Sequence, residues 1–253
     1  TTTCFYYFDN KTMAEFARIL GKDATVYEQK AEYLKQLIMK KYFNVERGVF
    51  SNGSQAAQGV ALYLGIVPDE YAQRVADNLS KMIKDNGNAL DCGMLGSKTI
   101  LRVLCDYGHA DQAYQLASRS ESPSWGSWIK RGLTSLPETW NLSPTFRDAS
   151  LNHVFLGDVQ AWMYQYLAGI MYDTQCPGFK HVLLQPRFVK GLDGAKAEYN
   201  SPAGLIKSAW KRKGNSIILD VELPANTSAT LITDGKKQEL TGGHHRIKLA
   251  AGK

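Results

Sequence analysis

The side chains with the clearest chemical potential gather in one loop-rich stretch of the chain. Three of the five tryptophans lie there, Trp125, Trp128 and Trp140, together with Glu138 and His153. An indole face stacks on the apolar face of a sugar ring, and a pair of carboxylates supplies the acid and the base of glycoside hydrolysis. These residue types together predict a carbohydrate site.

Each of these residues also has an ordinary structural alternative. Trp125 and Trp128 are equally suited to a core position between helix ends. Glu138 suits a helix N-terminus or a surface ion pair, and His153 suits a buried, hydrogen-bonded position. The Pro-Glu-Thr-Trp sequence around Glu138, preceded by apolar Leu136, favours a loop pinned against the core.

The stretch that carries these residues, 120–156, is the only long segment with neither helical nor strand periodicity. Long irregular segments in compact domains are usually functional or disordered, and this one is too aromatic for disorder. Upstream and directly downstream of it, apolar residues recur at helical spacing. The spacing predicts helices over 5–20, 25–43, 55–64, 69–85, 92–107, 110–118 and 157–173.

After Pro177 the apolar residues alternate with polar ones, which is typical of strands. The sequence predicts strands over 181–184, 195–199, 205–210, 216–223, 228–232 and 246–249. Short, closely spaced strands predict a small antiparallel β-sandwich or a similar antiparallel sheet. We therefore expect an α + β chain of two domains, a helical one over 1–176 and a β domain over 177–253.

The composition is that of an ordinary globular protein, with 44% apolar and 21% charged residues in 253. The 30 Lys and Arg exceed the 24 Asp and Glu by six, but they are scattered rather than gathered in a stripe. We therefore expect no nucleic-acid partner. No apolar run approaches the roughly 18 to 20 residues of a membrane helix, so no membrane partner is expected either.

No metal and no other cofactor is expected. The four cysteines lie far apart, at Cys4, Cys92, Cys105 and Cys176. They lack the paired spacing of a zinc site and are expected to be buried thiols. His244 and His245 are adjacent, but no third ligand follows at a fixed offset.

The ordered motifs of the chain resemble the C-terminal half of bacterial α-L-rhamnosidases of glycoside hydrolase family 78. The resemblance covers nearly the whole chain, and its motifs are specific only together. They are Asp91-Cys92-Gly93-Met94-Leu95-Gly96, Pro123-Ser124-Trp125-Gly126, Leu136-Pro137-Glu138-Thr139-Trp140, Ser150-Leu151-Asn152-His153 with Phe155 and Gly157, Tyr166-Leu167-Ala168-Gly169-Ile170 with Pro177-Gly178-Phe179-Lys180, and Gly204-Leu205-Ile206-Lys207-Ser208-Ala209-Trp210.

The resemblance implies the later helices of a toroidal (α/α)6 catalytic barrel, followed by the C-terminal β-sandwich. It implies inverting hydrolysis of terminal α-L-rhamnosyl groups from a glycan or glycoside, with Glu138 as general base. His153 matches a histidine that contacts the sugar, and Trp125 and Trp140 match aromatic positions that line the pocket. A periplasmic or secreted location is favoured for such an enzyme.

The general acid is not placed by any matching motif. Asp9, Glu15, Asp91 and Asp148 are carboxylates that the fold could bring near a pocket. The chain also begins without Met, directly before an apolar cluster. We expect a fragment that needs the rest of a parent polypeptide, because half a toroid exposes apolar helix faces; a divergent, inactive relative is the other interpretation.

Two further functions stay open at this level. A helical toroid can act on another sugar or on a uronate, because a fold alone does not fix a substrate. The chain can also be a non-catalytic remnant whose tryptophans bind carbohydrate without turnover. Turnover of a panel of aryl glycosides distinguishes the first alternative from rhamnoside hydrolysis. Binding of rhamnose without hydrolysis identifies the second.

Overall fold

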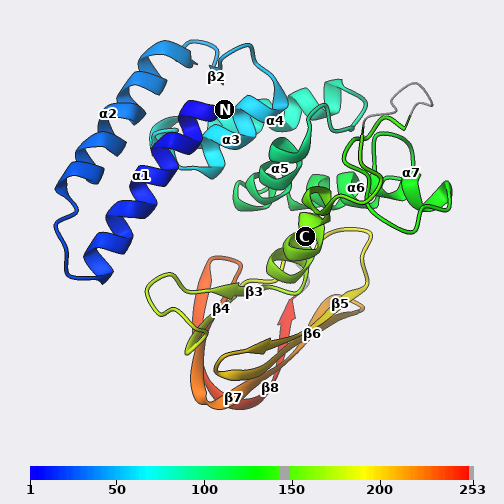
Figure 1. Cartoon of the computed structure of the whole chain (residues 1–253). Coiled ribbons are helices and arrows are strands. Elements are labelled where there is room, and N and C mark those ends of the chain that lie inside the picture. The colour runs from blue at the N-terminus through cyan, green and yellow to red at the C-terminus, as the bar shows by residue number, and fades with distance from the viewer. Residues whose placement is uncertain (143–148, 251–253) are drawn as a thin grey trace. The chain divides into compact units, whose positions relative to one another are not determined.

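The computed structural model describes residues 1–142 and 149–250 of the 253. The chain divides into two compact units, Thr1–Leu156 and Gly157–Lys253, each of which has its own internal packing (Figure 1). The sequence predicts a domain boundary later, after Cys176. The last helical turns and the first strand of the sheet therefore belong to the second compact unit.

The first unit is helical, with one short β-hairpin (Figure 1). Its elements are α1 (Thr2–Ile19), α2 (Thr25–Tyr42), β1 (Phe43–Asn44), β2 (Val49–Phe50), α3 (Gln55–Tyr63), α4 (Asp69–Asp85), α5 (Met94–Asp106), α6 (Ala110–Ser118) and α7 (Trp125–Lys130). The six helices predicted before residue 120 are confirmed, with ends that shift by at most three residues.

Two elements of the first unit are absent from the sequence prediction. The hairpin of β1 and β2 has two residues per strand, and α7 has six, so neither is long enough to show a period. The start of α7 does carry a local signal. The Ser124 hydroxyl accepts a hydrogen bond from the Ser127 backbone N–H over 3.0 Å, as a helix N-cap does.

The core of the first unit lies between α3, α4 and α5, and α6 packs against α5. Val75, Leu79 and Ile83 of α4 recur at a spacing of four residues and are fully buried. Buried Gln58 of α3 holds the β2 strand to this core, because its amide accepts from the Phe50 N–H (2.8 Å) and donates to the Phe50 carbonyl (3.0 Å).

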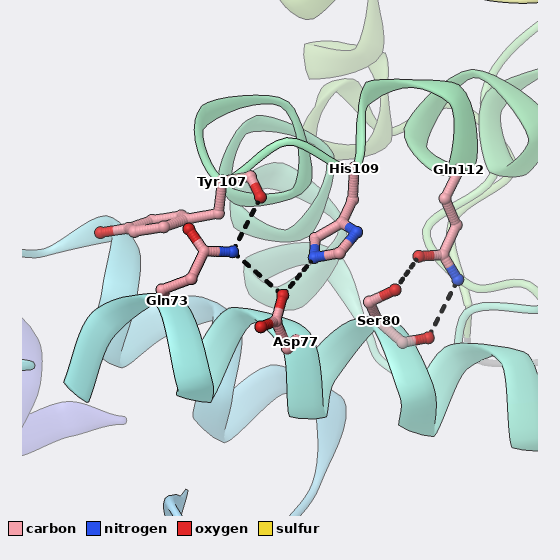
Figure 2. A network of polar contacts seen from close by, with 6 residues as sticks. All are labelled: Gln73, Asp77, Ser80, Tyr107, His109 and Gln112. Atoms are coloured by element: carbon pink, nitrogen blue, oxygen red, sulfur yellow. Dashed lines mark hydrogen bonds and ion pairs between the residues drawn. The ribbon is translucent and has the colours of Figure 1, made fainter.

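Polar side chains fasten α4 to α6 and to the turn before it (Figure 2). Ser80 donates to the Gln112 side-chain oxygen over 2.7 Å, and the Gln112 amide donates back to the Ser80 carbonyl over 3.0 Å. Asp77 lies 2.8 Å from Nε2 of His109 and accepts from the Gln73 amide over 3.0 Å. The Ser80–Gln112 pair satisfies polar groups that the helix packing buries, whereas Gln73 and Asp77 are exposed.

The α1–α2 hairpin exposes many of its large apolar side chains. Ala14, Ala17 and Ala24 form a small buried cluster between the helices, and the half-buried Tyr27 packs against it. Large apolar side chains of the same two helices are exposed instead. They are Tyr6, Phe8, Met13, Phe16, Ile19, Val26, Tyr33, Leu37 and Tyr42.

The second unit begins with a short helical segment and continues as a sheet (Figure 1). The helical segment consists of the 3-10 turn η1 (Val154–Asp158), the α-helical turn α8 (Val159–Trp162) and the π-helical turn η2 (Met163–Leu167). The first of these begins just before the unit boundary. The helix predicted over 157–173 was therefore wrong beyond residue 167. Gly169 ends it in the left-handed region (φ 82°), where a Cβ would also lie 2.3 Å from the Pro186 nitrogen.

The strands of this unit are β3 (Ile170–Tyr172), β4 (His181–Leu184), β5 (Gly194–Ser201), β6 (Gly204–Lys213), β7 (Ser216–Thr233) and β8 (Lys236–Ala250). They form one sheet in the order β3-β4-β7-β6-β5, with β8 paired along β7. The two strands predicted at 216–223 and 228–232 are one strand, interrupted by a register shift between Leu223 and Ser228. The predicted antiparallel arrangement was wrong for one pair, because β4 runs parallel to β7.

The sheet buries an aliphatic cluster around Trp210, Ile206, Leu219 and Leu231. Two side chains of strand β6 also form hydrogen bonds to the end of the preceding helical segment. The Trp210 indole N–H donates to the Leu167 carbonyl over 2.6 Å, and the Ser208 hydroxyl donates to the Ala168 carbonyl over 2.6 Å. The carbonyls that a helix end leaves unpaired are thus satisfied by the sheet.

The chain is therefore helical in its first unit and β-rich in its second, as the sequence predicts. Closure of the helices into an (α/α)6 toroid and the sandwich packing of the sheet stay predictions. Over residues 1–142 and 149–250, no helix combines the length and the apolar character that crossing a membrane requires.

Candidate active site

A cavity of about 580 Å³ opens in the first unit between two segments that are distant in sequence. One segment contains Asp91, Cys92 and Met94; the other contains Glu138 and Trp140. The volume lies within the range of small-molecule sites, roughly 300 to 1,000 Å³. The cavity thus combines two carboxylates with an indole.

Asp91 is placed by the backbone of the segment that leads into α5. The buried Gln55 side chain accepts from the Asp91 N–H over 2.9 Å and donates to the Ala89 carbonyl over 3.1 Å. The next turn packs closely, since a Cβ on Gly96 would lie 2.5 Å from the Cβ of Cys92. Gln55 and Gly96 together fix this wall of the cavity.

Trp140 is anchored to the same wall. Its indole N–H donates to the Cys92 carbonyl over 2.8 Å. Its ring stacks on Trp128, with centroids 4.8 Å apart, and meets the edge of Trp125 at 4.9 Å and an angle of 89°. Three tryptophans therefore form one cluster, and Trp140 is its member on the cavity.

Trp125 lies within that cluster rather than on the cavity. It is 8% exposed, and its indole N–H donates to the Leu156 carbonyl over 2.8 Å. In the described structure it packs against Trp140. The contact of Trp125 with a sugar, which the sequence predicts, stays a prediction.

Glu138 is oriented by the segment that follows it in the chain. Its backbone N–H donates to the Ser150 carbonyl over 2.8 Å, and its Oε2 accepts from the Ser150 N–H over 3.1 Å. A third bond, from the His153 N–H to the Leu136 carbonyl (2.7 Å), joins the same two segments. The carboxylate thus accepts one backbone hydrogen bond, and Glu138 lines the cavity.

His153 lies on the second of these segments and does not line the cavity that Glu138 lines. Its ring contacts Phe155, with centroids 4.7 Å apart, and its Nδ1 accepts from the Phe155 N–H over 3.4 Å. The structure therefore brings Glu138 and Trp140 to one cavity, places Trp125 beneath, and leaves His153 adjacent in the paired segment. Asp148 lies outside the described residues.

Cys92 is the nucleophilic side chain of this cavity, but it is held in its neutral form. Burial raises the pKa of its thiol to about 12, and the negative charge of Asp91 acts in the same direction. A thiol that stays protonated is a poor nucleophile. The carboxylates therefore carry the chemistry available here.

Sequence reasoning missed two contributions to the cavity. The Cys92 carbonyl and the Trp128 ring both position Trp140. The motifs that contain them were visible, but nothing in their spacing indicates that they meet. Asp91 was visible as a carboxylate in a Gly-rich turn, and the structure places it on the same cavity as Glu138.

Within the described part of the chain, no group of three or more His, Cys, Asp or Glu side chains could hold a metal ion. His244 and His245 lie in β8. The Nε2 of His244 is 3.6 Å from Asp220, and that of His245 is 2.6 Å from the Thr241 carbonyl.

Comparison with known families gives the class of the chain. Residues 1–167 match the bacterial alpha-L-rhamnosidase 6 hairpin glycosidase domain, and residues 169–248 match the bacterial alpha-L-rhamnosidase C-terminal domain. The helical part is thus of the glycosidase class. The chain belongs to the bacterial α-L-rhamnosidase family.

Individual relatives agree with this assignment. An alpha-L-rhamnosidase of Streptomyces avermitilis is 30% identical over 233 residues, and one of Formosa agariphila is 29% identical over 245 residues; each match covers 90% of this chain. The same matches cover 22% and 25% of those proteins. The chain therefore spans about a quarter of the length of the curated relatives it matches.

Solved structures show the same relation. The crystal structure of Streptomyces avermitilis alpha-L-rhamnosidase complexed with L-rhamnose matches 98% of this chain with a TM-score of 0.91 at 28% identity, over 26% of its own chain. The alpha-L-rhamnosidase from Dictyoglumus thermophilum matches 98% with a TM-score of 0.89 at 25% identity, over 31% of its chain.

Proposed function

We propose that this chain carries the general-base side of an inverting α-L-rhamnosidase. The observation that supports the proposal is the cavity on which Glu138 and Trp140 meet. A carboxylate that accepts a backbone hydrogen bond and lies next to an anchored indole suits the activation of water beside a sugar ring.

In the proposed reaction, Glu138 accepts a proton from a water molecule on one face of the rhamnosyl ring. The water oxygen forms a bond to the anomeric carbon as the bond from that carbon to the leaving oxygen breaks. A general acid protonates the leaving oxygen from the opposite face. The product is the sugar with inverted anomeric configuration.

The tryptophans and His153 have supporting roles in this proposal. Trp140 presents its ring to the apolar side of the sugar, and its indole bond to the Cys92 carbonyl keeps that ring in place. Trp125 and His153 are proposed to complete the sugar site as the family resemblance implies. Trp125 also packs edge-on against the Trp140 ring and so helps to hold it in place.

The general acid is proposed to come from the rest of a parent polypeptide. The exposed apolar side chains of α1 and α2 support this, since such a surface is normally covered. The relatives, about four times longer, contain chain that this one does not span. Asp91 shares the cavity with Glu138 and is the acid candidate within the described residues.

The direct test is Glu138→Gln in the complete enzyme. Turnover of an aryl α-L-rhamnoside should fall by about 10²- to 10⁴-fold, the usual contribution of a general base. Glu121→Gln is the matched control, because Glu121 forms an exposed ion pair with Lys130 (2.7 Å) and should leave turnover unchanged. Near-normal turnover of Glu138→Gln would reject the assignment.

The same assay separates the alternative functions. Faster turnover of an aryl α-glucoside or α-mannoside than of the rhamnoside would indicate a different sugar. Rhamnose binding by the complete enzyme without hydrolysis would indicate a carbohydrate-binding remnant. Asp91→Asn completes the set, because a loss that is greatest for substrates with poor leaving groups would identify Asp91 as the acid.

A further inference from the structure

A second cavity, of about 550 Å³, lies wholly within the second unit. Helical turns supply Gln160 and Tyr164 on one side, and the sheet side supplies Tyr172, Phe179 and Tyr199. It shares no lining residue with the cavity of Glu138. Nothing in the proposed hydrolysis uses it.

The lining has an unusual chemical composition for a surface hollow of a basic chain. Four of its nine lining residues are aromatic and two are glutamines, and none carries a charge. Tyr172 and Tyr199 are 56% and 38% exposed, so apolar ring surface faces the opening. An anion or a cation would enter without an opposite charge to pair with, at a large desolvation cost.

Aromatic rings next to amides fit a neutral saccharide. The C–H face of a pyranose packs on a tyrosine ring, while hydroxyls exchange hydrogen bonds with amide and phenol groups. Gln160 is exposed at the rim and offers both a donor and an acceptor. The few polar groups thus supplement a mainly apolar lining, as in ligand sites generally.

The aromatic residues are also held in place before any ligand arrives. Tyr172 pairs with Val182 in the β3–β4 ladder, and Tyr199 pairs with Ile206 in the β5–β6 ladder. The Phe179 ring packs on the buried core of the sheet and lies 4.9 Å from the Tyr199 ring. The sheet thus orders the backbone of Tyr172 and Tyr199, and core packing orders the Phe179 ring, which reduces the conformational entropy lost on binding.

We propose that this cavity is a binding site for a neutral saccharide, with Tyr172 and Tyr199 as stacking surfaces and Gln160 as a hydrogen-bonding group. It binds without cleaving, since none of its lining residues carries the carboxylates that glycoside hydrolysis requires. The proposal does not depend on the catalytic role of Glu138.

The test measures saccharide binding to the 253-residue chain by ligand-observed NMR and calorimetry. The probes are methyl α-L-rhamnoside, methyl α-D-glucoside and D-glucuronate. At least one neutral glycoside should bind with a Kd on the order of 1 mM, a common strength for a single small contact surface, and glucuronate should bind more weakly. Equal or tighter binding of glucuronate would overturn the neutral assignment.

Variants locate the binding. Tyr172→Ala should weaken it by roughly tenfold, the loss of one stacking contact, whereas Tyr172→Phe should retain most of it. Tyr33→Ala is the matched control, because Tyr33 is 55% exposed on α2. It should bind as the unaltered chain does.

Two further variants keep the result unambiguous. Gln160→Ala removes an exposed side chain and should weaken binding several-fold even if Tyr172→Ala fails to fold. Glu138→Gln should leave this binding unchanged, so the outcome is separate from that of the proposed hydrolysis. No neutral glycoside binding at tens of millimolar would overturn the proposal. So would binding that Gln160→Ala and Tyr172→Ala leave unchanged while Glu138→Gln or Trp140→Ala abolishes it.

Discussion

Glu138 owes its orientation to a neighbour in space, Ser150, which contacts it through backbone atoms alone. The Ser150 N–H donates to the carboxylate and its carbonyl accepts from the Glu138 N–H. Replacing the serine side chain therefore leaves both bonds available. Among the described residues, the orientation of Glu138 therefore depends on the pairing of two segments, 136–138 and 150–153.

Cys92 gives a prediction at the residue scale. Burial and Asp91 raise its folded-state pKa from 9.0 to about 12, so the folded chain holds this proton more tightly than the unfolded chain. The stabilisation is present below pH 9 and is lost as the pH rises toward 12. At the unfolded pKa of 9.0, alkylation of Cys92 should be at least about tenfold slower in the folded chain than in urea, because the thiolate is scarce.

Mass spectrometry after iodoacetamide treatment measures this rate, and Cys92→Ala identifies the labelled peptide. Equal rates in the folded and urea-unfolded chain at that pH would show that Cys92 is not protected as described.

The sequence could indicate Glu138 and Trp140 because their motif carries chemical types that suit a sugar. It could not indicate that Trp140 bonds to the Cys92 carbonyl, 48 residues away, or that Trp128 stacks on it. Contacts between distant segments are set by how helices end and loops return, which no local pattern encodes. Trp125 is an example: the local sequence around it is compatible with both a core position and a sugar-binding position, so it cannot distinguish the two.

At the scale of elements, the β1–β2 hairpin depends on α3 for its stability. Two-stranded hairpins are marginal in water on their own. Here the Gln58 amide pairs with both backbone groups of Phe50, and Gln58 has no exposed surface. Gln58 of α3 thus takes part of the place of a third strand, and Asn78 of α4 adds bonds to the Arg47 and Gly48 carbonyls (2.9 Å each).

Gln58→Leu should therefore lower the free energy of unfolding by about 1–3 kcal/mol for each backbone group left unpaired. Urea denaturation followed by circular dichroism measures the change. Gln36→Leu on α2 is the control. The exposed Gln36 amide donates to exposed Glu32 over 2.9 Å, so its removal should cost less than about 0.5 kcal/mol. A loss for Gln58→Leu no larger than for the control would contradict this account.

Elements with several turns of consistent period were predictable, as α2, α4 and α6 show. The end of the helical segment after residue 157 was not predictable, because its apolar pattern continues past Gly169, whereas the helical backbone ends there. Gly169 adopts a left-handed conformation against Pro186, and the chain then enters the sheet as β3. The length of β8 was also hidden, since Gly242 and Gly243 interrupt a pattern that the strand itself continues through.

At the scale of the molecule, the exposed apolar side chains of α1 and α2 stand out against the packed α3–α5 core. Ile19 is 78% exposed and Phe16 is 53% exposed. We expect this face to pack against the rest of a parent polypeptide, which the sequence predicts from the incomplete helical barrel.

Replacing Phe16 and Ile19 by Lys should reduce self-association of the 253-residue chain and change its free energy of unfolding by less than about 0.5 kcal/mol per site. In the complete enzyme the same changes should cost about 1.5–3 kcal/mol for each side chain that becomes buried there. Sedimentation velocity and urea denaturation measure the two effects. Ile129→Lys is the control, because Ile129 is 76% exposed on another helix; equal effects of both sets of changes would show that the α1–α2 face is not special.

The central claim, that Glu138 is the general base of an inverting hydrolysis, is tested most directly by chemical rescue. Glu138→Ala in the complete enzyme removes the group that activates water, so added azide, which needs no base, should attack the anomeric carbon in its place. We predict that azide restores turnover of an aryl α-L-rhamnoside and that NMR identifies the product as β-L-rhamnosyl azide. Formation of the α-azide, or full activity of Glu138→Ala without azide, would contradict the claim.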